Sequence, residues 1–340
     1  MENNNLLVEI KNLKTYFHLD EGIVRAVDGA EFDIYCGKTL GVVGESGCGK
    51  SVTARSVMRI VAKPGKIVDG QILYHRHYIG DNDVTEDILD LTTLKPQGDQ
   101  MRAIRGAEIA MVFQEPMTSL SPVHTIGNQI SESVLLHRDV TKQEAREQSI
   151  EMLDFVGMPL PSRTIDMYSY ELSGGMRQRA MIAMALSCRP SLLIADEPTT
   201  ALDVTTEAQI LKLMRHLQYE LGMAIMYITH NLGVIAQMAE NVVVMYMGKV
   251  VEQGDVDTIF HHPLHPYTQA LLQSIPRLGQ KTRDRRRLAS ISGMVPDPYA
   301  LPKGCPFHPR CRQRQLGLCD QQEPTMVEIE PGHKVRCLRL

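Results

Sequence analysis

Residues 44–51 read Gly44-Glu45-Ser46-Gly47-Cys48-Gly49-Lys50-Ser51 and match the phosphate-binding pattern G-x-x-x-x-G-K-[ST] at every fixed position. The apolar run at residues 38–43 predicts a buried strand before this stretch, and residues 51–60 have helical spacing after it. Glycines let a backbone wrap closely around an anion, and the N-terminus of the next helix directs N–H groups at it. We therefore predict a nucleotide site rather than a glycine-rich turn without function. Lys50 is expected to reach the β- and γ-phosphates, and Ser51 to offer its hydroxyl to Mg²⁺.

The composition is that of a globular chain without an electrostatic footprint for nucleic acid. With 340 residues, of which 43% are hydrophobic, the chain has room for one large domain and an appendage, or for two modest domains. Thirty-six basic and 40 acidic residues leave a formal charge of −4, so we expect no nucleic-acid partner. No apolar run approaches the ~18–20 residues of a membrane span, and the start MENNNLLVEI lacks the features of a secretory signal. We therefore expect the chain on the cytosolic side.

The N-terminal third predicts an antiparallel β region. Residues 6–14 and 24–35 alternate apolar and polar side chains, which is the period of a half-buried strand. Tyr16 or Phe17 lies at its rim, where an aromatic ring could stack on adenine or simply pack on the core. In the polar stretch that follows we expect a strand at residues 71–74, a variable acidic loop through residues 81–90 and a helix entering near residues 97–104.

The middle of the chain predicts an inserted α-helical subdomain. Residues 107–114 read as a buried strand that ends on Gln114, and prolines follow directly. Residues 126–157 then have helical character, with Thr141 as an N-cap and Gly157 as a stop. This stretch lies between strand signals, so we place it as an insertion in an α/β core.

A second loop with the features of an anion site reads Leu172-Ser173-Gly174-Gly175-Met176-Arg177-Gln178-Arg179. A serine and two glycines precede a strong helical run through Leu186, so N–H groups again gather at a helix N-terminus. A single phosphate loop does not need a second such surface. A site shared between two chains does.

Two carboxylates follow the next buried strand, residues 192–195. Parallel α/β sheets place ligand chemistry at the carboxyl ends of their strands, so Asp196 is expected to hold Mg²⁺ through water and Glu197 to polarise the attacking water. A solvated acidic turn is the alternative.

A helix over residues 205–221 and a strand at residues 223–229 lead to His230, which we expect at the γ-phosphate rather than in a structural role. Residues 241–252 predict a closing hairpin.

Taken together, these motifs resemble the ATP-binding cassette (ABC) family over residues 6–258. The family's glutamine loop falls on Gln114, its signature on residues 172–178, its D-loop on residues 201–203 and its switch histidine on His230. The resemblance implies an α/β P-loop ATPase core with an antiparallel β subdomain and an inserted helical subdomain. Two such domains would dimerise head to tail, so that each signature loop covers the partner's ATP and Gln114 couples the site to a membrane subunit.

The resemblance also assigns the site residues. Those expected to contact ATP are Phe17 (with Tyr16 as the alternative), Gly44, Glu45, Ser46, Gly47, Cys48, Gly49, Lys50, Ser51 and Val52. Glu197, His230, Gln114 and Lys50 are the expected catalytic residues, and Ser51, Gln114 and Asp196 the expected Mg²⁺ ligands. The partner's site would receive Ser173, Gly174, Gly175 and Gln178, and Asp203 belongs to the D-loop.

The last 80 or so residues narrow the resemblance. The segments HHPLHPYTQALL (residues 261–272) and GCPFHPRC (residues 304–311) resemble the C-terminal extension of oligopeptide/dipeptide importer ATPases. We therefore divide the chain into an ABC domain (residues 1–258, helical subdomain about 116–172) and an extension (259–340). The implied assembly contains a second, distinct ATPase subunit, two permeases and an extracytoplasmic substrate-binding protein, with this chain at the cytoplasmic face of the membrane.

The sequence leaves alternatives for the transported substrate and for the class of protein. Di- or oligopeptides are the expected cargo, and oligosaccharides or nickel are the alternatives within the wider group. A soluble cassette ATPase acting on nucleic acid or ribosomes would carry two cassettes, long insertions or a basic face, none of which this sequence has. A P-loop kinase does not explain the LSGG stretch at residues 172–175.

Four cysteines gather at the C-terminal end, with the spacing C-x5-C-x7-C-x17-C: Cys305, Cys311, Cys319 and Cys337. The segment is too short and too rich in Pro and Arg to build a core alone, and disulfides conflict with a cytosolic location. Four thiolates on long loops suit a [4Fe–4S] cluster, which occurs in members of the resembled subfamily. Zinc, with His308 and His333 as spare ligands, and no metal at all are the alternatives. The basic run at residues 281–287 reads either as a solvated linker or as a contact for anionic lipid.

Overall fold

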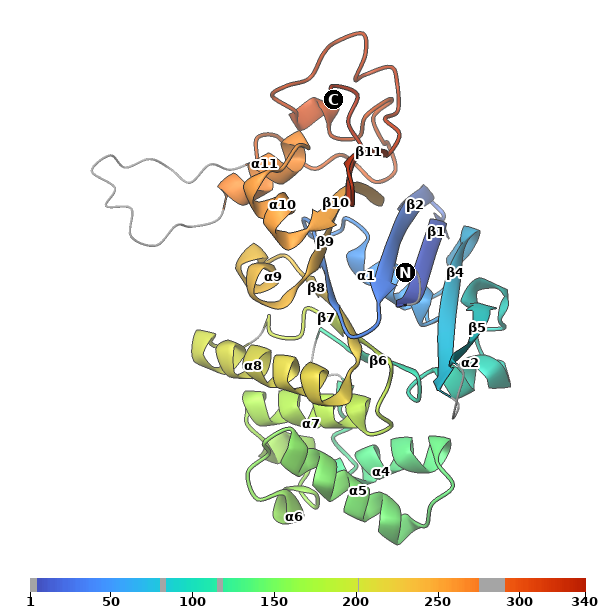
Figure 1. The fold of residues 1–340 in the computed structure, drawn as a ribbon, viewed down its shortest axis with the longest axis vertical. Coiled ribbons are helices and arrows are strands. Elements are labelled where there is room, and N and C mark those ends of the chain that lie inside the picture. Colours follow the sequence, from blue (N-terminus) through green and yellow to red (C-terminus); the bar gives the residue numbers. More distant parts are fainter. Residues whose placement is uncertain (1–4, 80–83, 115–118, 201, 275–290) are drawn as a thin grey trace, which may run out of the picture. The chain divides into compact units, whose positions relative to one another are not determined.

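The computed structural model describes residues 5–79, 84–114, 119–200, 202–274 and 291–340. The chain forms two compact units (Figure 1). Unit 1 comprises Met1–Leu7, Ile34–Thr39 and Thr93–Ile228, and unit 2 comprises Val8–Asp33, Leu40–Thr92 and Thr229–Leu340. The basic run at residues 281–287 lies outside the described residues.

Unit 1 is built on parallel strands. β6 (Ile109–Val112) pairs with β7 (Leu192–Asp196), which pairs with β8 (Ala224–Thr229), all in parallel. Every residue of these strands is buried, as expected for a parallel sheet covered on both faces, and their sequences are accordingly continuous apolar runs. The predicted strands are confirmed, and the carboxyl end of β7 carries the Asp196–Glu197 pair.

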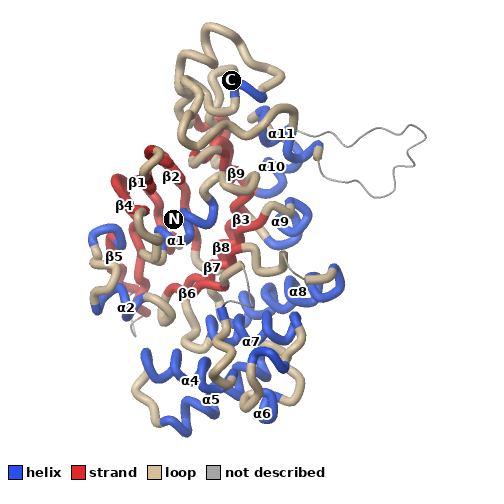
Figure 2. The backbone as a smooth tube through the Cα atoms, turned by 180° about the vertical axis from the view of Figure 1, so that it is seen from behind, coloured by secondary structure: helices blue, strands red, loops and turns tan. Residues whose placement is uncertain are grey.

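Helices form the rest of unit 1: α2 (Asp99–Ile104), α4 (Ile126–His137), α5 (Lys142–Phe155), α6 (Pro161–Thr164), α7 (Gly174–Leu186) and α8 (Val204–Leu221). The helices α4 to α7 pack together as a group in both backbone views (Figures 1 and 2). Thr141 caps α5 as predicted. Its side chain accepts from the Glu144 N–H, and the Glu144 carboxylate accepts from the Thr141 N–H at 2.7 Å. That cap, with extended backbone at Arg138, divides the predicted helical stretch into two helices.

Unit 2 contains a four-stranded sheet in the order β2-β1-β4-β5 among the described residues. Its strands are β1 (Leu6–Leu19), β2 (Gly22–Tyr35), β4 (Gly65–Ile79) and β5 (Val84–Asp90), and β1 pairs antiparallel with β4 as β4 does with β5. β1 and β2 confirm the predicted β region.

The prediction for the acidic stretch is wrong. Instead of a short strand followed by a variable loop, β4 and β5 form a long antiparallel pair, with Leu73 opposite Asp90 and His75 opposite Ile88. Acidic residues are poor strand formers, but β5 is an edge strand, whose outward side chains stay in water while its backbone pairs with β4. The tertiary pairing overrides the local preference.

A second group of strands in unit 2 carries the phosphate loop. β3 (Thr39–Val43) runs parallel to β9 (Asn241–Tyr246), and β9 forms the predicted hairpin with β10 (Lys249–Asp255) around Gly248. The C-terminal tail extends this group, because β12 (His333–Val335) pairs with β10 and β11 (Val327–Glu330) pairs with β12. The associated helices are α1 (Lys50–Val57), α9 (Leu232–Met238), α10 (Val256–His261) and α11 (Pro266–Gln273).

The tail packs on the rest of unit 2 through Phe307, while many of its other large apolar side chains, such as Leu316, are exposed. Phe307, which is 3% exposed, packs on Tyr246 of β9 and Tyr267 of α11 with ring centroids 5.3 and 5.4 Å apart. The ring centroids of Tyr246 and Tyr267 are 4.7 Å apart. This aromatic cluster holds the tail beside the β9–β10 hairpin, in agreement with the expectation that the tail cannot fold on apolar burial alone.

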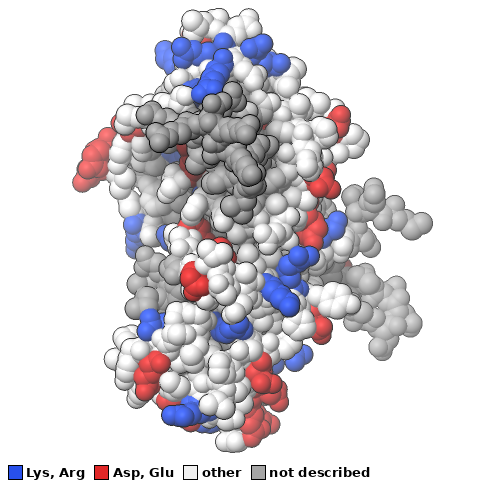
Figure 3. All heavy atoms as spheres, turned by 90° about the vertical axis from the view of Figure 1, so that its left-hand side faces the viewer, with Lys and Arg blue, Asp and Glu red and all other residues white. Residues whose placement is uncertain are grey.

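Figure 3 shows Lys and Arg side chains gathered at the end that the C-terminal tail forms, and charges of both signs elsewhere on that face. Among the described residues, every helix is too short or too polar to cross a membrane.

Candidate functional site

The phosphate loop, residues 44–49, connects β3 to α1 in unit 2. Gly44, Gly47 and Gly49 have φ angles of 152°, 79° and 103°, a region that side chains with a Cβ rarely adopt. A Cβ on Gly44 would collide with the Met245 carbonyl oxygen, and one on Gly49 with that of Ala26. Only glycine fits these positions, so the backbone of the loop is closely confined by β9 and β2.

The Lys50 ammonium lies inside this loop. It donates to the carbonyl oxygens of Gly44 at 2.8 Å and Glu45 at 3.1 Å, and the side chain is 5% exposed. Gly49 precedes it as the N-cap of α1, so the positive end of a helix and a buried cation share one small space. That combination suits the phosphates of a nucleotide.

Glu45 is held by the C-terminal extension. Its backbone N–H donates to the Tyr267 hydroxyl at 2.9 Å, and its carboxylate forms a bidentate ion pair with Arg310, at 2.6 and 3.0 Å. The sequence predicted Glu45 as an ATP contact, and Tyr267 and Arg310 only as parts of family motifs. The contact between Arg310 and Glu45 was not predicted, because nothing in the sequence relates residues 265 positions apart.

In unit 1, Glu197 stands directly after β7 with a φ of 47°, which is strained for a residue with a side chain. Its N–H donates to the Ile228 carbonyl at 2.9 Å, which fixes the backbone against β8. Its carboxylate accepts from Gln114 Nε2 and from Thr200 Oγ1, both at 3.0 Å. The structure therefore brings together Gln114 and Glu197, which are 83 residues apart in the sequence.

Asp196 and His230 lie where the sequence placed them, at the carboxyl ends of β7 and β8. Asp196 is the last residue of β7 and is 2% exposed, so its carboxylate lies at the buried carboxyl end of the parallel sheet. His230 comes directly after β8 and is exposed. Their roles at a metal ion and at the γ-phosphate remain predictions.

The signature loop, residues 172–175, leads into α7 of unit 1. Ser173 is the N-cap, and its hydroxyl accepts from the Met176 N–H at 3.3 Å. The loop lies against the predicted D-loop segment, since Cβ atoms on Gly174 and Gly175 would meet Leu202 at 3.8 Å and Thr206 at 2.9 Å.

Asp203 is the N-cap of α8 and accepts from the N–H groups of Thr205 and Thr206, both at 3.0 Å. These bonds hold the pKa of its carboxyl below the usual range; hydrogen bonds from the Thr206 side chain and backbone contribute most. The D-loop aspartate therefore stays charged while it orders the helix start behind the signature loop.

Gln178 does not match its expected place. Its side chain is fully buried inside unit 1, and neither amide atom has a hydrogen-bond partner among the described residues. Burial argues against direct contact with a nucleotide held by another chain. Ser173 and Gly174 are the exposed members of the signature.

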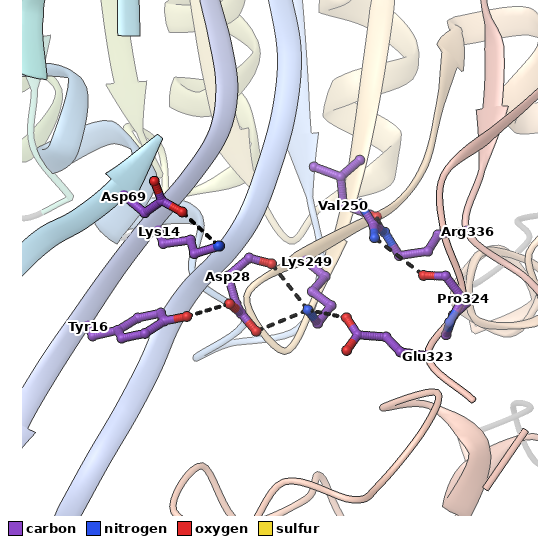
Figure 4. A network of polar contacts seen from close by, with 9 residues as sticks. All are labelled: Lys14, Tyr16, Asp28, Asp69, Lys249, Val250, Glu323, Pro324 and Arg336. Atoms are coloured by element: carbon purple, nitrogen blue, oxygen red, sulfur yellow. Dashed lines mark hydrogen bonds and ion pairs between the residues drawn. The ribbon is translucent and has the colours of Figure 1, made fainter. Parts of the chain in front are cut away.

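The two adjacent aromatic residues of β1, Tyr16 and Phe17, lie in different environments. The Tyr16 hydroxyl donates to Asp28 at 2.6 Å, and Asp28 in turn accepts from Lys249 at 3.0 Å (Figure 4). Burial and the bond to Asp28 raise the pKa of Tyr16 to about 12. Phe17 instead packs against Gly65 and leaves no space for a Cβ there. Tyr16 is thus tied into a polar network, which favours Phe17 as the adenine-stacking ring.

Lys249 also links β10 to the tail. It forms an ion pair with Glu323 at 2.6 Å, and Arg336 donates to the Val250 carbonyl at 2.9 Å (Figure 4). Nearby, the fully buried Glu252 accepts from the Leu264 and His265 N–H groups at 2.7 and 3.1 Å and pairs with His333 at 2.9 Å. One carboxylate therefore fastens both ends of the extension to β10.

The four tail cysteines are free thiols. Burial, with smaller contributions from the charges of the other three tail cysteines, raises the pKa of Cys305 to about 11. Among the residues that the structure describes, however, no three His, Cys, Asp or Glu side chains are grouped so as to hold a metal ion. The donor chemistry fits a thiolate-ligated group; a formed ligand set is not present, and the predicted cluster stays a prediction.

Comparisons with known proteins agree with these motifs. A family model described as "ABC transporter" matches residues 27–200, and one described as "Oligopeptide/dipeptide transporter, C-terminal region" matches residues 251–319. The "Probable peptide ABC transporter ATP-binding protein y4tR" of Sinorhizobium fredii is 48% identical, over 98% of this chain and 95% of its own length. The "Oligopeptide transport ATP-binding protein AppD" of Bacillus subtilis is 47% identical, over 97% and 96%.

A solved dimeric structure of the ATP-binding cassette MJ0796, in a post-hydrolysis state bound to ADP and Pi, is similar with a TM-score of 0.62 and 26% identity. The structural match covers 74% of this chain and 99% of the MJ0796 chain. Fold and motifs thus define an ABC-type ATPase, and the predicted α/β fold class is confirmed. Within that class, the chain belongs to the ABC transporter ATP-binding subunits of the oligopeptide/dipeptide importer family.

Proposed function

We propose that this chain is the ATP-hydrolysing motor subunit of a membrane importer for di- or oligopeptides. The observation that carries the proposal is the match of both the cassette and the C-terminal extension to peptide-transporter families, with relatives named for peptide transport along nearly the full length. The cassette supplies ATP chemistry common to all cargoes, and the extension supports the choice of peptide importer.

ATP would bind along residues 44–52 with its adenine on Phe17. Lys50 would leave the Gly44 and Glu45 carbonyls for the β- and γ-phosphates, because a phosphate oxygen is a stronger acceptor for an ammonium than a carbonyl. Ser51, Gln114 and Asp196 are the residues we assign to Mg²⁺, which when bound neutralises charge on the phosphates. Each offers an oxygen, the ligand type that Mg²⁺ prefers.

Glu197 is the proposed general base. Its backbone is fixed by β8, and its carboxylate is oriented by Gln114 and Thr200, so one carboxylate position is defined before substrate arrives. In that role Glu197 would orient the attacking water and accept its proton as the water adds to the γ-phosphate. His230 would steady the γ-phosphate. Because Gln114 bonds to Glu197 directly, a movement of the glutamine loop changes the orientation of the base.

The working unit would be a head-to-tail pair with a second, homologous ATPase subunit. Ser173, Gly174 and Gly175 would complete the partner's ATP site, and the γ-phosphate would distinguish the closed pair from the open one. Two permeases and an extracytoplasmic substrate-binding protein would complete the assembly at the cytoplasmic face of the membrane. The solved MJ0796 cassette, which is a dimer, supports the pairing.

Uptake by the reconstituted complex tests the proposal. The chain is assembled with the permeases and ATPase encoded next to it, in vesicles, and ATP-dependent uptake is measured for labelled dipeptides, oligopeptides, oligosaccharides and Ni²⁺. Peptide uptake with ATPase activity stimulated by the peptide-loaded binding protein is the expected result. Uptake of only sugar or nickel would overturn the peptide assignment and leave the motor assignment intact.

We also propose that Cys305, Cys311, Cys319 and Cys337 hold a [4Fe–4S] cluster in a structural or sensing role. The support is chemical: four free thiols in a tail without a core of its own. Protein purified without oxygen should be brown and carry about four irons and four sulfides per chain. A colourless protein with one zinc per chain, unchanged by added iron, decides for zinc.

A further inference from the structure

The ion pair between Arg310 and Glu45 joins the C-terminal tail to the phosphate loop. Both guanidinium Nη atoms reach the carboxylate, at 2.6 and 3.0 Å, in the bidentate arrangement that is the strongest form of this pair. The Arg310 side chain is 4% exposed and that of Glu45 is 26% exposed. A contact so well shielded from water is not a loose surface pair.

Arg310 is itself fixed from several sides. Its Nε donates to the Ser292 carbonyl at 3.3 Å, its Nη1 lies 3.4 Å from the Tyr246 hydroxyl, and the guanidinium lies over the Tyr246 ring, 5.8 Å from its centroid. Residues 308–310 form a short 3₁₀ turn between Cys305 and Cys311. The arginine is therefore presented by the cysteine-containing segment and oriented by β9.

The charge of Glu45 needs this partner. The residue lies within the loop that surrounds the phosphates, and an unpaired carboxylate there repels a triphosphate and competes for the Lys50 ammonium. The Lys50 Nζ already donates to the Glu45 carbonyl at 3.1 Å, so the ammonium lies beside the backbone of the residue that carries the carboxylate. With Arg310 in place the carboxylate is neutralised and turned toward the tail, while Tyr267 accepts from the Glu45 N–H at 2.9 Å.

We infer that Arg310 is a positioning residue for ATP binding: it holds and neutralises Glu45, so that the phosphate loop offers Lys50 and its N–H groups to the nucleotide. The inference rests on the proposed function, in which residues 44–51 bind ATP. It gives the cysteine-containing tail a defined effect on the motor, because any change that displaces residues 308–310 releases an anion into the phosphate site.

Nucleotide titrations on the full-length chain test the inference. R310Q should bind Mg-ATP about tenfold more weakly, because a released unit charge near the phosphates acts at an intermediate effective dielectric constant. The loss should be smaller for ADP and absent for adenosine. R310K, which keeps the charge without the fork, should fall between wild type and R310Q. The matched control is R312Q, which removes an exposed arginine of the same tail that contacts Ser292 instead of the loop, and it should bind ATP like wild type.

The double variant E45Q/R310Q separates positioning from simple stabilisation of the tail. Since it carries no carboxylate to release, it should bind ATP at least about fivefold more tightly than R310Q, even if its melting temperature is equally lowered. Wild-type affinity in R310Q, or a double variant as weak as R310Q, would overturn the inference. K50A reports on the site itself: if K50A binds ATP like wild type, the proposed phosphate site fails, whereas weak binding by K50A beside normal binding by R310Q refutes only the role of Arg310.

Discussion

Two loops of this protein precede a helix N-terminus and are proposed to bind phosphate, yet they are held in different ways. The phosphate loop of unit 2 is enclosed: β2 and β9 leave no room for a Cβ on Gly44 or Gly49, and Tyr267 and Arg310 hold Glu45. The signature loop of unit 1 is stabilised by the Ser173 cap and by the neighbouring D-loop, while Ser173 and Gly174 remain exposed.

The difference follows from what each loop must do alone. A loop that binds a highly charged ligand within one chain must be preorganised, because ordering it on binding would cost affinity. A loop that completes a site in another chain needs an accessible face. The enclosed loop and the open loop thus support the proposal of an ATP site shared between two subunits.

Glu197→Gln should produce the largest loss of ATPase turnover and should leave the signature loop in place on the partner's ATP. The amide keeps the shape of the side chain but cannot accept a proton from water, so turnover should fall about a thousandfold while ATP still binds. The ATP-bound pair of subunits should then persist, which size-exclusion chromatography of the complex measures. Normal hydrolysis by this variant in the complex would remove Glu197 from its proposed role.

Substitutions in the two loops should separate binding from completion of the partner's site. Lys50→Ala removes the buried cation of the enclosed loop and should weaken ATP binding to the isolated chain about a hundredfold. Ser173→Arg, in the open loop, should leave that binding unchanged and block turnover in the complex. Loss of ATP binding by the isolated Ser173→Arg chain would show that the loop serves its own nucleotide, contrary to the comparison.

Alanine at a glycine of each loop should show the same contrast in stability. Gly49→Ala places a Cβ against the Ala26 carbonyl at a φ of 103°, and should lower the free energy of unfolding by about 3 kcal/mol or more. Gly174→Ala has open space, its nearest atom being 3.8 Å away, and should change stability by less than about 1 kcal/mol. Equal losses in urea unfolding would mean that the signature loop is as enclosed as the phosphate loop.

The last prediction concerns the pH dependence of stability at the attachment that places Tyr267 beside the phosphate loop. Burial lowers the pKa of His265 to about 3, and its Nδ1 accepts from the Tyr267 N–H at 3.0 Å. The unfolded chain protonates this histidine below about pH 6.5 whereas the folded chain does not, so the unfolded state binds more protons and stability falls with decreasing pH. The slope from this group approaches about 1.4 kcal/mol per pH unit between those pKa values.

Denaturant unfolding at several pH values measures this slope. His265→Asn is the matched variant, because asparagine still caps α11 but does not titrate. It should flatten the stability curve between about pH 4 and 6.5. Parallel curves for wild type and variant would show that His265 is protonated in the folded protein.

Local signals in the sequence predicted most of the elements correctly. Thr141 caps α5, and the buried strands β3, β6, β7 and β8 follow apolar runs, because caps and continuous apolar stretches depend on neighbours in the chain. The motif residues of both loops were predicted for the same reason: each loop is a contiguous segment whose chemistry is written in adjacent positions.

Contacts between distant segments were not accessible in this way. β5 was missed because its acidic residues disfavour a strand until β4 pairs with it, and Gln178 was assigned to the partner's site although its side chain is buried. Neither outcome depends on the local sequence, since pairing and burial are decided by which other element lies alongside.

The sequence by itself determined that this chain is an ABC-type ATPase with a phosphate loop, a signature loop and a four-cysteine tail, because those features are contiguous motifs. Only the tertiary structure decided that Gln114 meets Glu197 and that Arg310 pairs with Glu45. Side chains separated by 83 and 265 positions leave no periodic or local trace of their contact. Both pairs form only when the folded chain brings distant segments together, and the buried Arg310 guanidinium needs a carboxylate within reach because folding excludes water from it.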